Sequence, residues 1–277
     1  MRDTPQSLGR TPAQHLASAA LGQRRATAKI GGTMTADLLH DSPPMLNSSP
    51  PAILAPLHAI VARTNEVAKN FGRRAALHDL QHRLVNRLVP FQVLKGMTAV
   101  AGEIDKTLLD AGSLQSRFAT RDELLAATSN PELGEEMSVG FVDQALRRGD
   151  ECYGIFDGEK LVSVGWYSNQ PTQLSDNLTL CFDRSWMYMY KGYTLRSHRG
   201  KRLHGVGMSK ALVAYVKRGA RGLISYVRST NFQSLRSTEK MGYRIFGDIY
   251  IAEAIGRPLI WATPGCAAYD FRVEYRR

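Results

Sequence analysis

The stretch from Trp186 to Gly219 constrains the fold more than any other part of the chain. It opens with WMYMYKGYT (186–194), where aromatic residues alternate with Met and Lys, and this period of two predicts a β-strand. A basic loop, LRSHRGKRLHG (195–205), comes next, and then a run whose apolar residues recur at helical spacing. A strand, a glycine-containing basic loop and a helix direct unpaired backbone N–H groups and a helix N-terminus toward an anion, usually a phosphate.

The loop does not fit two common phosphate-binding motifs. No G-x-x-x-x-G-K-[ST] segment can be written across it. Gly205 and Gly207 lack the third glycine of the G-x-G-x-x-G dinucleotide fingerprint. The loop instead resembles the acyl-CoA loop of the GNAT superfamily of acyltransferases, which is a strand, then V-x-P-x-x-R-G-x-G-x-G/A, then a helix. The residues in step with that pattern are Thr194, Leu195, Arg196, Ser197, His198, Arg199, Gly200 and Lys201.

Two residues depart from this pattern. Arg202 and His204 stand where the superfamily has small residues. A register shifted by three satisfies the bare R-x-x-G-x-G with Arg202, Gly205 and Gly207. The first register is preferred because it keeps the distance from the strand.

A second motif supports the resemblance. GLISYVRST (222–230) reads as a strand, and the superfamily's later motif places Asn at such a strand end, a small residue three positions on, and Glu-Lys-x-Gly-aromatic at the end of the following helix. The matching residues are Asn231, Ser234, Glu239, Lys240, Gly242 and Tyr243. With two motifs in the right order, the resemblance covers residues 91–277.

The resemblance implies acetyl-CoA, or another acyl-CoA, as cofactor. The backbone N–H groups of the loop would face its diphosphate, and the loop cations would add charge-assisted contacts. The residues implied to bind it are Thr194, Leu195, Arg199, Gly200, Lys201, Arg202, Leu203, His204, Gly205 and Asn231. The pantetheine arm would lie between the strands 186–194 and 223–229. The oxyanion donor would be a backbone N–H at a bulge near residues 193–195.

The proton-transfer groups depart from the superfamily. Its usual acid, a Tyr seven residues after the Asn, is here Thr238, whose hydroxyl has no useful pKa. The strand 186–194 also lacks the Asp or Glu that often serves as base. The candidate catalytic residues are Tyr188, Tyr190, His204 and Glu239, with Tyr193 and His198 as further substitutes. Trp166 and Tyr167 either line the acceptor pocket or belong to the core.

The chain divides into three parts. Residues 1–50 are rich in Ala, Ser, Thr and Pro and are expected to be a disordered tail. Residues 51–89 form a helical extension, and residues 90–277 form the acyltransferase domain. The expected order is a strand at 91–99, helices at 121–130 and 138–150, a hairpin at 151–168, a strand at 178–182 and final strands at 243–254 and 258–265. This is an α/β (α+β) fold of GNAT type, with a mixed, mostly antiparallel sheet flanked by helices.

The second helix of the extension, which ends before Pro90, is basic and amphipathic. Its apolar face is predicted from Leu77, Leu80, Leu84, Val85 and Leu88, and its polar face from Arg73, Arg74, His78, His82, Arg83 and Arg87. Such a helix packs on its own domain, or docks on a membrane surface or an acidic acyl carrier protein. His78 and His82 are spaced for metal chelation, but no carboxylate completes a site, so no metal is expected.

Composition adds three constraints. With 277 residues and 43% apolar content, the chain can build one sizeable core. No apolar run approaches the ~20 residues of a membrane-spanning helix. The net charge of +11 favours acidic partners, namely CoA phosphates, nucleic acid or an anionic membrane surface. Cys152, Cys181 and Cys266 are expected to be reduced, buried thiols, which favours a cytoplasmic protein.

The sequence therefore favours an N-acyltransferase. It would move an acetyl or other acyl group from acyl-CoA to a small-molecule or peptide amine by direct attack. The alternative is a GNAT-like binding module that has lost catalysis and uses its basic surface on nucleic acid or a membrane.

Overall fold

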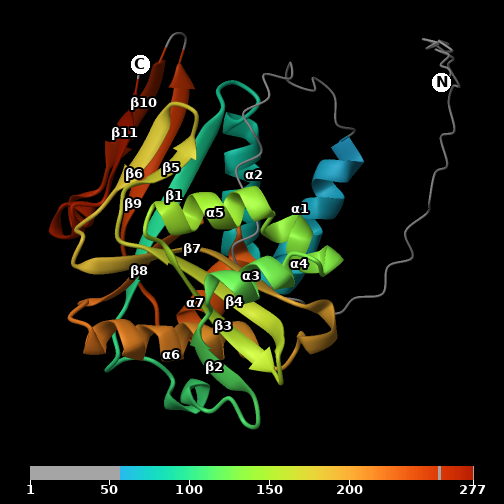
Figure 1. Cartoon of the computed structure of the whole chain (residues 1–277). Coiled ribbons are helices and arrows are strands. Elements are labelled where there is room, and N and C mark those ends of the chain that lie inside the picture. The colour runs from blue at the N-terminus through green and yellow to red at the C-terminus, as the bar shows by residue number, and fades with distance from the viewer. Residues whose placement is uncertain (1–56, 255–256, 277) are drawn as a thin grey trace, which may run out of the picture. The chain divides into compact units, whose positions relative to one another are not determined.

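The computed structural model describes residues 57–254 and 257–276 (Figure 1). The predicted tail and the first six residues of the helical extension lie outside the described residues. Within them, an eight-stranded sheet and a three-stranded sheet are flanked by helices. The predicted fold class, a mixed and mostly antiparallel sheet flanked by helices, is confirmed.

The main sheet has the strand order β10-β9-β1-β8-β7-β4-β3-β2. Its strands are β1 (Phe91–Ala99), β2 (Gln115–Phe118), β3 (Glu151–Asp157), β4 (Lys160–Ser168), β7 (Trp186–Thr194), β8 (Gly222–Arg228), β9 (Arg244–Ala254) and β10 (Arg257–Ala262). All described neighbours in it are antiparallel except β7 and β8. These two pair in parallel only over Trp186–Tyr188 and Gly222–Ile224, so they diverge beyond Tyr188.

The helices are α1 (Leu57–Phe71), α2 (Arg73–Val85), α3 (Arg121–Ala127), α4 (Pro131–Glu136), α5 (Val139–Arg147), α6 (Leu203–Lys217) and α7 (Phe232–Lys240). Short 3-10 helices occur at η1 (Lys106–Leu109), η2 (Arg196–His198) and η3 (Pro264–Tyr269). The sequence predicted two helices between 121 and 150, and the structure has three. Asn130 caps α4 by accepting from the Glu132 N–H, and Pro131 begins that helix.

Two adjacent residues of β4 show how the layers stack. The Trp166 ring meets Phe141 of α5 at a centroid distance of 5.2 Å, and the Tyr167 ring meets Tyr215 of α6 at 5.3 Å. Because successive strand residues point to opposite faces, α5 and α6 cover opposite sides of the sheet (Figure 1). Trp166 and Tyr167 are both fully buried, so they belong to the core and do not line an acceptor pocket.

A small second sheet completes the domain. It has the order β11-β6-β5, with β5 (Thr172–Ser175), β6 (Leu178–Cys181) and β11 (Arg272–Tyr275). Leu180 of β6 packs with Trp186, Ile249 and Phe271 in a separate hydrophobic cluster against the main sheet. Of these three strands, the sequence predicted only β6.

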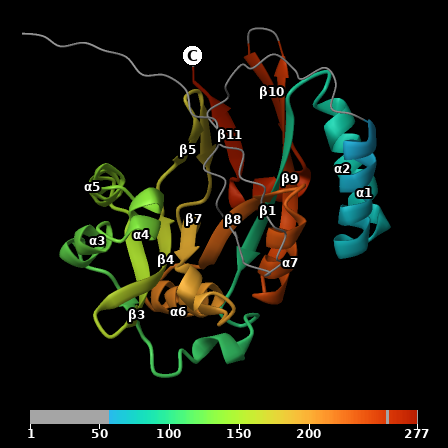
Figure 2. The ribbon, with the colours of Figure 1, turned by 90° about the vertical axis from the view of Figure 1, so that its right-hand side faces the viewer.

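Helices α1 and α2 form a hairpin beside the domain (Figure 2). Gly72 joins them with a left-handed φ of 90°. The contacts that attach the hairpin to the domain include that of the Phe71 ring, 5.6 Å from the Phe232 ring, and that of His78 Nε2, 2.9 Å from Ser229 Oγ. None of the described helices combines the length and apolar composition that a bilayer crossing requires.

The predicted orientation of α2 is wrong. His78, expected on the polar outer face, hydrogen-bonds to the domain, and the His82 ring lies against Phe91 at 5.8 Å. Leu77 and Leu84, expected to be buried, are 56% and 49% exposed.

Candidate cofactor pocket and active site

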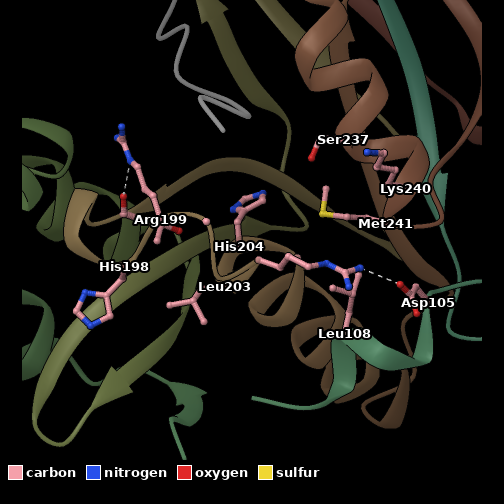
Figure 3. A pocket seen from close by; sticks show the side chains of 13 residues that line it. Asp105, Leu108, His198, Arg199, Leu203, His204, Ser237, Lys240 and Met241 are labelled. Atoms are coloured by element: carbon pink, nitrogen blue, oxygen red, sulfur yellow. Dashed lines mark hydrogen bonds and ion pairs between the residues drawn. The ribbon is translucent and has the colours of Figure 1, made fainter. Parts of the chain in front are cut away.

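A pocket of ≈ 550 Å³ lies where β7 ends and α6 begins (Figure 3). The loop between them forms one side, and the C-terminal end of α7 forms another. The lining residues are Asp105, Leu108, Thr194, His198, Arg199, Gly200, Arg202, Leu203, His204, Gly205, Ser237, Lys240 and Met241. The structure therefore brings seven of the ten predicted cofactor-binding residues around one hollow, Arg202 and His204 among them. The buried Leu195, Lys201 and Asn231 are not among the lining residues.

The loop backbone shows why small residues suit two of its positions. Gly200 has a φ of +81°, and Arg202 has a φ of +59°, in the left-handed region that most L-residues avoid. Arg202 is also the N-cap residue of α6, and its side chain makes no capping hydrogen bond. Its guanidinium instead pairs with Asp105 across the pocket, with Nη2 and Oδ2 2.9 Å apart.

The first turn of α6 presents unpaired donors. Val206 is the first residue whose N–H closes a helical bond, to the Arg202 carbonyl at 3.0 Å. Within the described part of the chain, the N–H groups of Leu203, His204 and Gly205 donate to no protein acceptor. Free N–H groups and the positive end of a helix dipole together favour an anion.

The charged side chains around these donors have different roles. Arg199 Nε donates to the Thr194 carbonyl at 3.1 Å, which ties the loop to the end of β7. Lys240 extends into the pocket from α7 (Figure 3). Hydrogen bonds from Thr107 and Arg202 hold the pKa of Asp105 below its usual range, so this carboxyl is ionised at neutral pH. Lys201 is exposed and lies outside the pocket lining.

His204 stands between the two sides of the pocket, with Leu203 and Arg199 on one side and Met241 on the other (Figure 3). Its ring lies against the backbone of β7: a Cβ atom on Gly192 would be 2.4 Å from His204 Cε1. Burial of the ring lowers the pKa of His204 to about 4. The imidazole is therefore neutral at pH 7, so it can accept a proton only weakly.

β7 carries a bulge next to the point where it leaves β8. Lys191 pairs with Trp166 of β4 and Met189 pairs with Tyr167, which leaves Tyr190 without a partner of its own. The bulge was expected near residues 193–195, and that expectation is wrong. Leu195 has no free donor there, because its N–H bonds to the Val162 carbonyl at 2.9 Å.

The backbone before the bulge faces the gap between the strands. The Met189 carbonyl accepts a hydrogen bond from Ser225 Oγ of β8 at 2.9 Å. A residue's N–H and C=O point to the same side of a strand, so the Met189 N–H also faces β8, where the last parallel pair is that of Tyr188 with Ile224. The strands separate beyond this residue.

Tyr190 meets a buried carboxylate on the other face of the sheet. Its hydroxyl donates to Asp150 Oδ2 at 2.8 Å, and Asp150, 3% exposed, also pairs with Arg148. Burial, followed by the charge of Asp150, raises the pKa of Tyr190 well above its usual range. Tyr190 is therefore a hydrogen-bond donor at neutral pH and is unsuited to act as a base.

Tyr188 is a core aromatic. It is 3% exposed, and its ring stacks between those of Tyr190 and Tyr226, at centroid distances of 6.2 and 6.3 Å. Burial raises the pKa of its phenol well above the usual range. No proton transfer at neutral pH is expected from this group.

The predicted residues of α7 lie apart from the pocket. Glu239 is exposed and lines a separate hollow that also contacts Phe71 of α1. The Thr238 hydroxyl lies 3.0 Å from the Ser234 and Leu235 carbonyls, which hold its proton within the helix. Asn231 caps α7 by accepting from the Ser234 N–H at 3.1 Å.

One phenol near the bulge was treated in the sequence only as a motif residue. Tyr243, 7% exposed, places its hydroxyl 4.0 Å from the Met189 sulfur. A thioether is a weak acceptor, so this buried donor has no strong protein partner. Burial raises the pKa of Tyr243 above its usual range, and the phenol stays protonated at neutral pH. The only sequence signal for it is the aromatic position that closes the second motif.

The cysteines and histidines add no metal centre among the described residues. Cys152, Cys181 and Cys266 are free and buried, which confirms the predicted buried thiols. In the described ranges, no group of three or more His, Cys, Asp or Glu side chains could hold a metal ion.

The order of elements decides the fold. A first strand, helices, antiparallel strands, a bulged strand that diverges from its parallel neighbour, a loop and a helix follow one another as the sequence resemblance predicted. The fold is of the GNAT type. Among solved structures, the chain is similar to a GCN5-related N-acetyltransferase-like protein from Streptococcus suis, at 15% identity and a TM-score of 0.41, over 75% of this chain and 69% of that one.

Two other solved structures are similar at the same level. An acetyltransferase from the GNAT family of Colwellia psychrerythraea has 13% identity and a TM-score of 0.42, over 58% of this chain and 55% of that one. A GCN5-related N-acetyltransferase from Kribbella flavida has 12% identity and a TM-score of 0.38, over 70% and 66%. No protein-family model and no curated protein matches the chain. Likeness at this level does not extend to substrate or mechanism.

Proposed function

We propose that this GNAT-type chain transfers an acyl group, in the simplest case acetyl, from acyl-CoA to a small-molecule or peptide amine. The observation that carries the proposal is the pocket at the start of α6. Three unpartnered N–H groups, those of Leu203, His204 and Gly205, and the side chain of Lys240 lie around this pocket. The pocket adjoins the end of β7, the bulged strand that diverges from β8. The buried free thiols support action in the cytoplasm.

The pocket fits a diphosphate group. The N–H groups of Leu203, His204 and Gly205 would donate to its oxygens, and Lys240 would supply a positive charge. Arg202 would be shared between the anion and Asp105, its present partner. When bound, acyl-CoA supplies an acyl group activated as a thioester.

The chain's own groups can stabilise charge in such a transfer. Beyond Met189, the β8-facing peptide groups of β7 have no strand partner. Their N–H groups would donate to an acyl oxygen as it gains negative charge. The bulge at Tyr190 fixes the direction of this edge, and the bond from Tyr190 to Asp150 anchors the bulge from the opposite face.

Proton balance assigns a role to Tyr243. The attacking amine loses one proton and the departing sulfur gains one. A phenol that stays protonated at neutral pH and contacts β7 beside the bulge can donate to that sulfur. Tyr243 would then fill the role that Thr238 cannot, and water can accept the proton of the amine.

One observation favours the alternative of a binding module without catalysis. The His204 ring lies against Gly192, beside the gap that an extended arm would enter, so the arm passes only if this ring turns aside. If the His204 ring stays in this position, the pocket would hold only the diphosphate end of CoA, without its pantetheine arm.

Turnover separates the two functions. Acetyl-CoA is incubated with the full chain and a panel of amines, and free CoA thiol is measured, with an acyl carrier protein thioester as a second acyl donor. Amine-dependent thiol release supports the transferase. Binding of CoA with no release across the panel would support the binding module.

A further inference from the structure

The α1–α2 hairpin turns leucines outward. Leu77, Leu84 and Leu88 are 56%, 49% and 86% exposed, while Ala76 and Asp79 are buried. Leu77 and Leu84, seven residues apart, lie along one side of α2, and Leu88 follows in the turn after the helix ends at Val85. Of the large apolar residues exposed in the described ranges, six lie between Val61 and Val89.

A second group of exposed apolar residues lies at the edge of the main sheet. The Phe91 ring joins this edge to the inner side of α2, at 5.8 Å from the His82 ring and 6.2 Å from the Trp261 ring of β10. Trp261 and Leu259 are 48% and 54% exposed, and their spacing of two puts them on one face of β10. The C-terminal end of α2 and β10 lie near the same end of the domain (Figure 2). We call Leu77, Leu84, Leu88, Leu259 and Trp261 the outer apolar patch.

Positive charge surrounds the outer apolar patch. Residues 57–90 contain six Arg or Lys and two Asp or Glu, a net charge of +4. Asp79, one of the two acids, already pairs with Arg83 at 2.8 Å. Among the described residues, Arg73, Arg74 and Arg87 form no ion pair, so their charge is available to a partner. We call these three the arginine rim.

We propose that the outer apolar patch and the arginine rim dock the chain on the surface of an anionic lipid bilayer. Exposed leucines and a tryptophan beside arginines are the composition that inserts at the level of lipid headgroups. The arginines then gain from anionic lipids. This proposal is independent of the acyl-transfer reaction.

The shape of the patch favours a bilayer over an acidic protein. It is the outer stripe of a helix and part of an edge strand, and none of its five residues lines the cofactor pocket or the hollow beside α7. Protein partners are usually held by anchor residues in fitted pockets. A bilayer deforms around protruding side chains and needs no such fit.

The test is sedimentation of the full chain with vesicles of phosphatidylcholine alone and of phosphatidylcholine with 30% phosphatidylglycerol. We expect binding to the anionic vesicles only, and weaker binding at high salt. The rim variant Arg73→Gln/Arg74→Gln/Arg87→Gln should lose about a hundredfold in affinity. The patch variant Leu84→Ser/Leu88→Ser/Trp261→Ser should lose about tenfold or more.

Control variants carry changes of the same kind elsewhere. Arg147→Gln/Lys160→Gln/Lys217→Gln removes three exposed charges, and Val139→Ser removes an exposed apolar side chain from α5. Both controls should bind like the unchanged chain, and the controls and the rim variant should keep its melting temperature. The patch variant loses the ring contacts of Trp261 and should melt lower, and its binding is measured below its own melting temperature. Failure of the unchanged chain to bind anionic vesicles would overturn the proposal, as would equal loss in the controls. Binding to a purified acyl carrier protein without vesicle binding would assign the surface to an acidic protein instead.

Discussion

The Tyr190 hydroxyl and the buried Asp150 carboxylate are 2.8 Å apart, and they join the bulge of β7 to the first turn after α5. The two residues are 40 positions apart in sequence. Asp150 also pairs with Arg148, so one carboxylate holds a strand bulge and a helix end together.

Removal of Asp150 should therefore destabilise the fold more than removal of the Tyr190 hydroxyl. Asp150→Ala leaves the half-buried Arg148 guanidinium unpaired and should cost about 3 kcal/mol of unfolding free energy. Tyr190→Phe leaves the ion pair in place and should cost about 1.5 kcal/mol. Urea unfolding of both variants measures the two losses of unfolding free energy. A larger loss in Tyr190→Phe than in Asp150→Ala would contradict this account.

Tyr243→Phe tests the proposed proton donor. The hydroxyl has only a thioether as partner, so its loss should leave the unfolding free energy nearly unchanged. If the phenol protonates the departing sulfur, turnover should fall by about 10²–10⁴-fold, with the KM for acetyl-CoA unchanged. Steady-state kinetics with the best amine of the panel measure both constants. Unaltered turnover would remove Tyr243 from the mechanism.

Arg202 tests the left-handed backbone of the loop. Arg202→Gly and Arg202→Val both remove the ion pair with Asp105, so their difference isolates the backbone. Glycine adopts a φ of +59° without strain, whereas a β-branched residue is strongly disfavoured there. The Val variant should be less stable than the Gly variant by about 1–2 kcal/mol in urea unfolding. Equal stabilities would mean that the loop does not hold this conformation.

His204 should make stability depend on pH. Its pKa is about 4 in the folded chain, below the ordinary value of 6.5, so between these pH values the unfolded chain binds more protons. Acidification through this window should therefore lower the unfolding free energy, by up to about 1.4 kcal/mol per pH unit. The His204→Gln variant should lack this component, as urea unfolding at pH 7 and pH 5 would show. Parallel losses in both proteins would show that the ring is not buried as described.

The local pattern of the sequence was sufficient for the main strands and for the loop. The strands expected at 91–99 and 186–194 match β1 and β7 to the residue. At 186–194 the signal was the period of two, because side chains alternate between the two faces of a sheet. The residues of the loop between β7 and α6 were predicted to lie at one site, because this loop is short.

Contacts between distant segments could not be predicted in this way. The bulge at Tyr190 depends on the register of β4, and the role of Asp150 depends on where α5 ends. Leu77 and Leu84 of α2 form the expected stripe, but this stripe faces outward. The opposite side of the helix contacts the domain, where His78 hydrogen-bonds to Ser229 after β8. Periodicity defines a stripe and does not say what covers it.

Calorimetric titration of acetyl-CoA into three proteins tests the central claim, that the start of α6 holds the cofactor. Lys240 lines the pocket, whereas Lys217, which is also exposed, ends α6 at its other terminus. The unchanged chain and Lys217→Glu should bind with the same affinity. Lys240→Glu should bind about tenfold or more weakly, because repulsion replaces a charge-assisted contact. Equal affinities for all three proteins, or no heat of binding in the unchanged chain, would contradict the account.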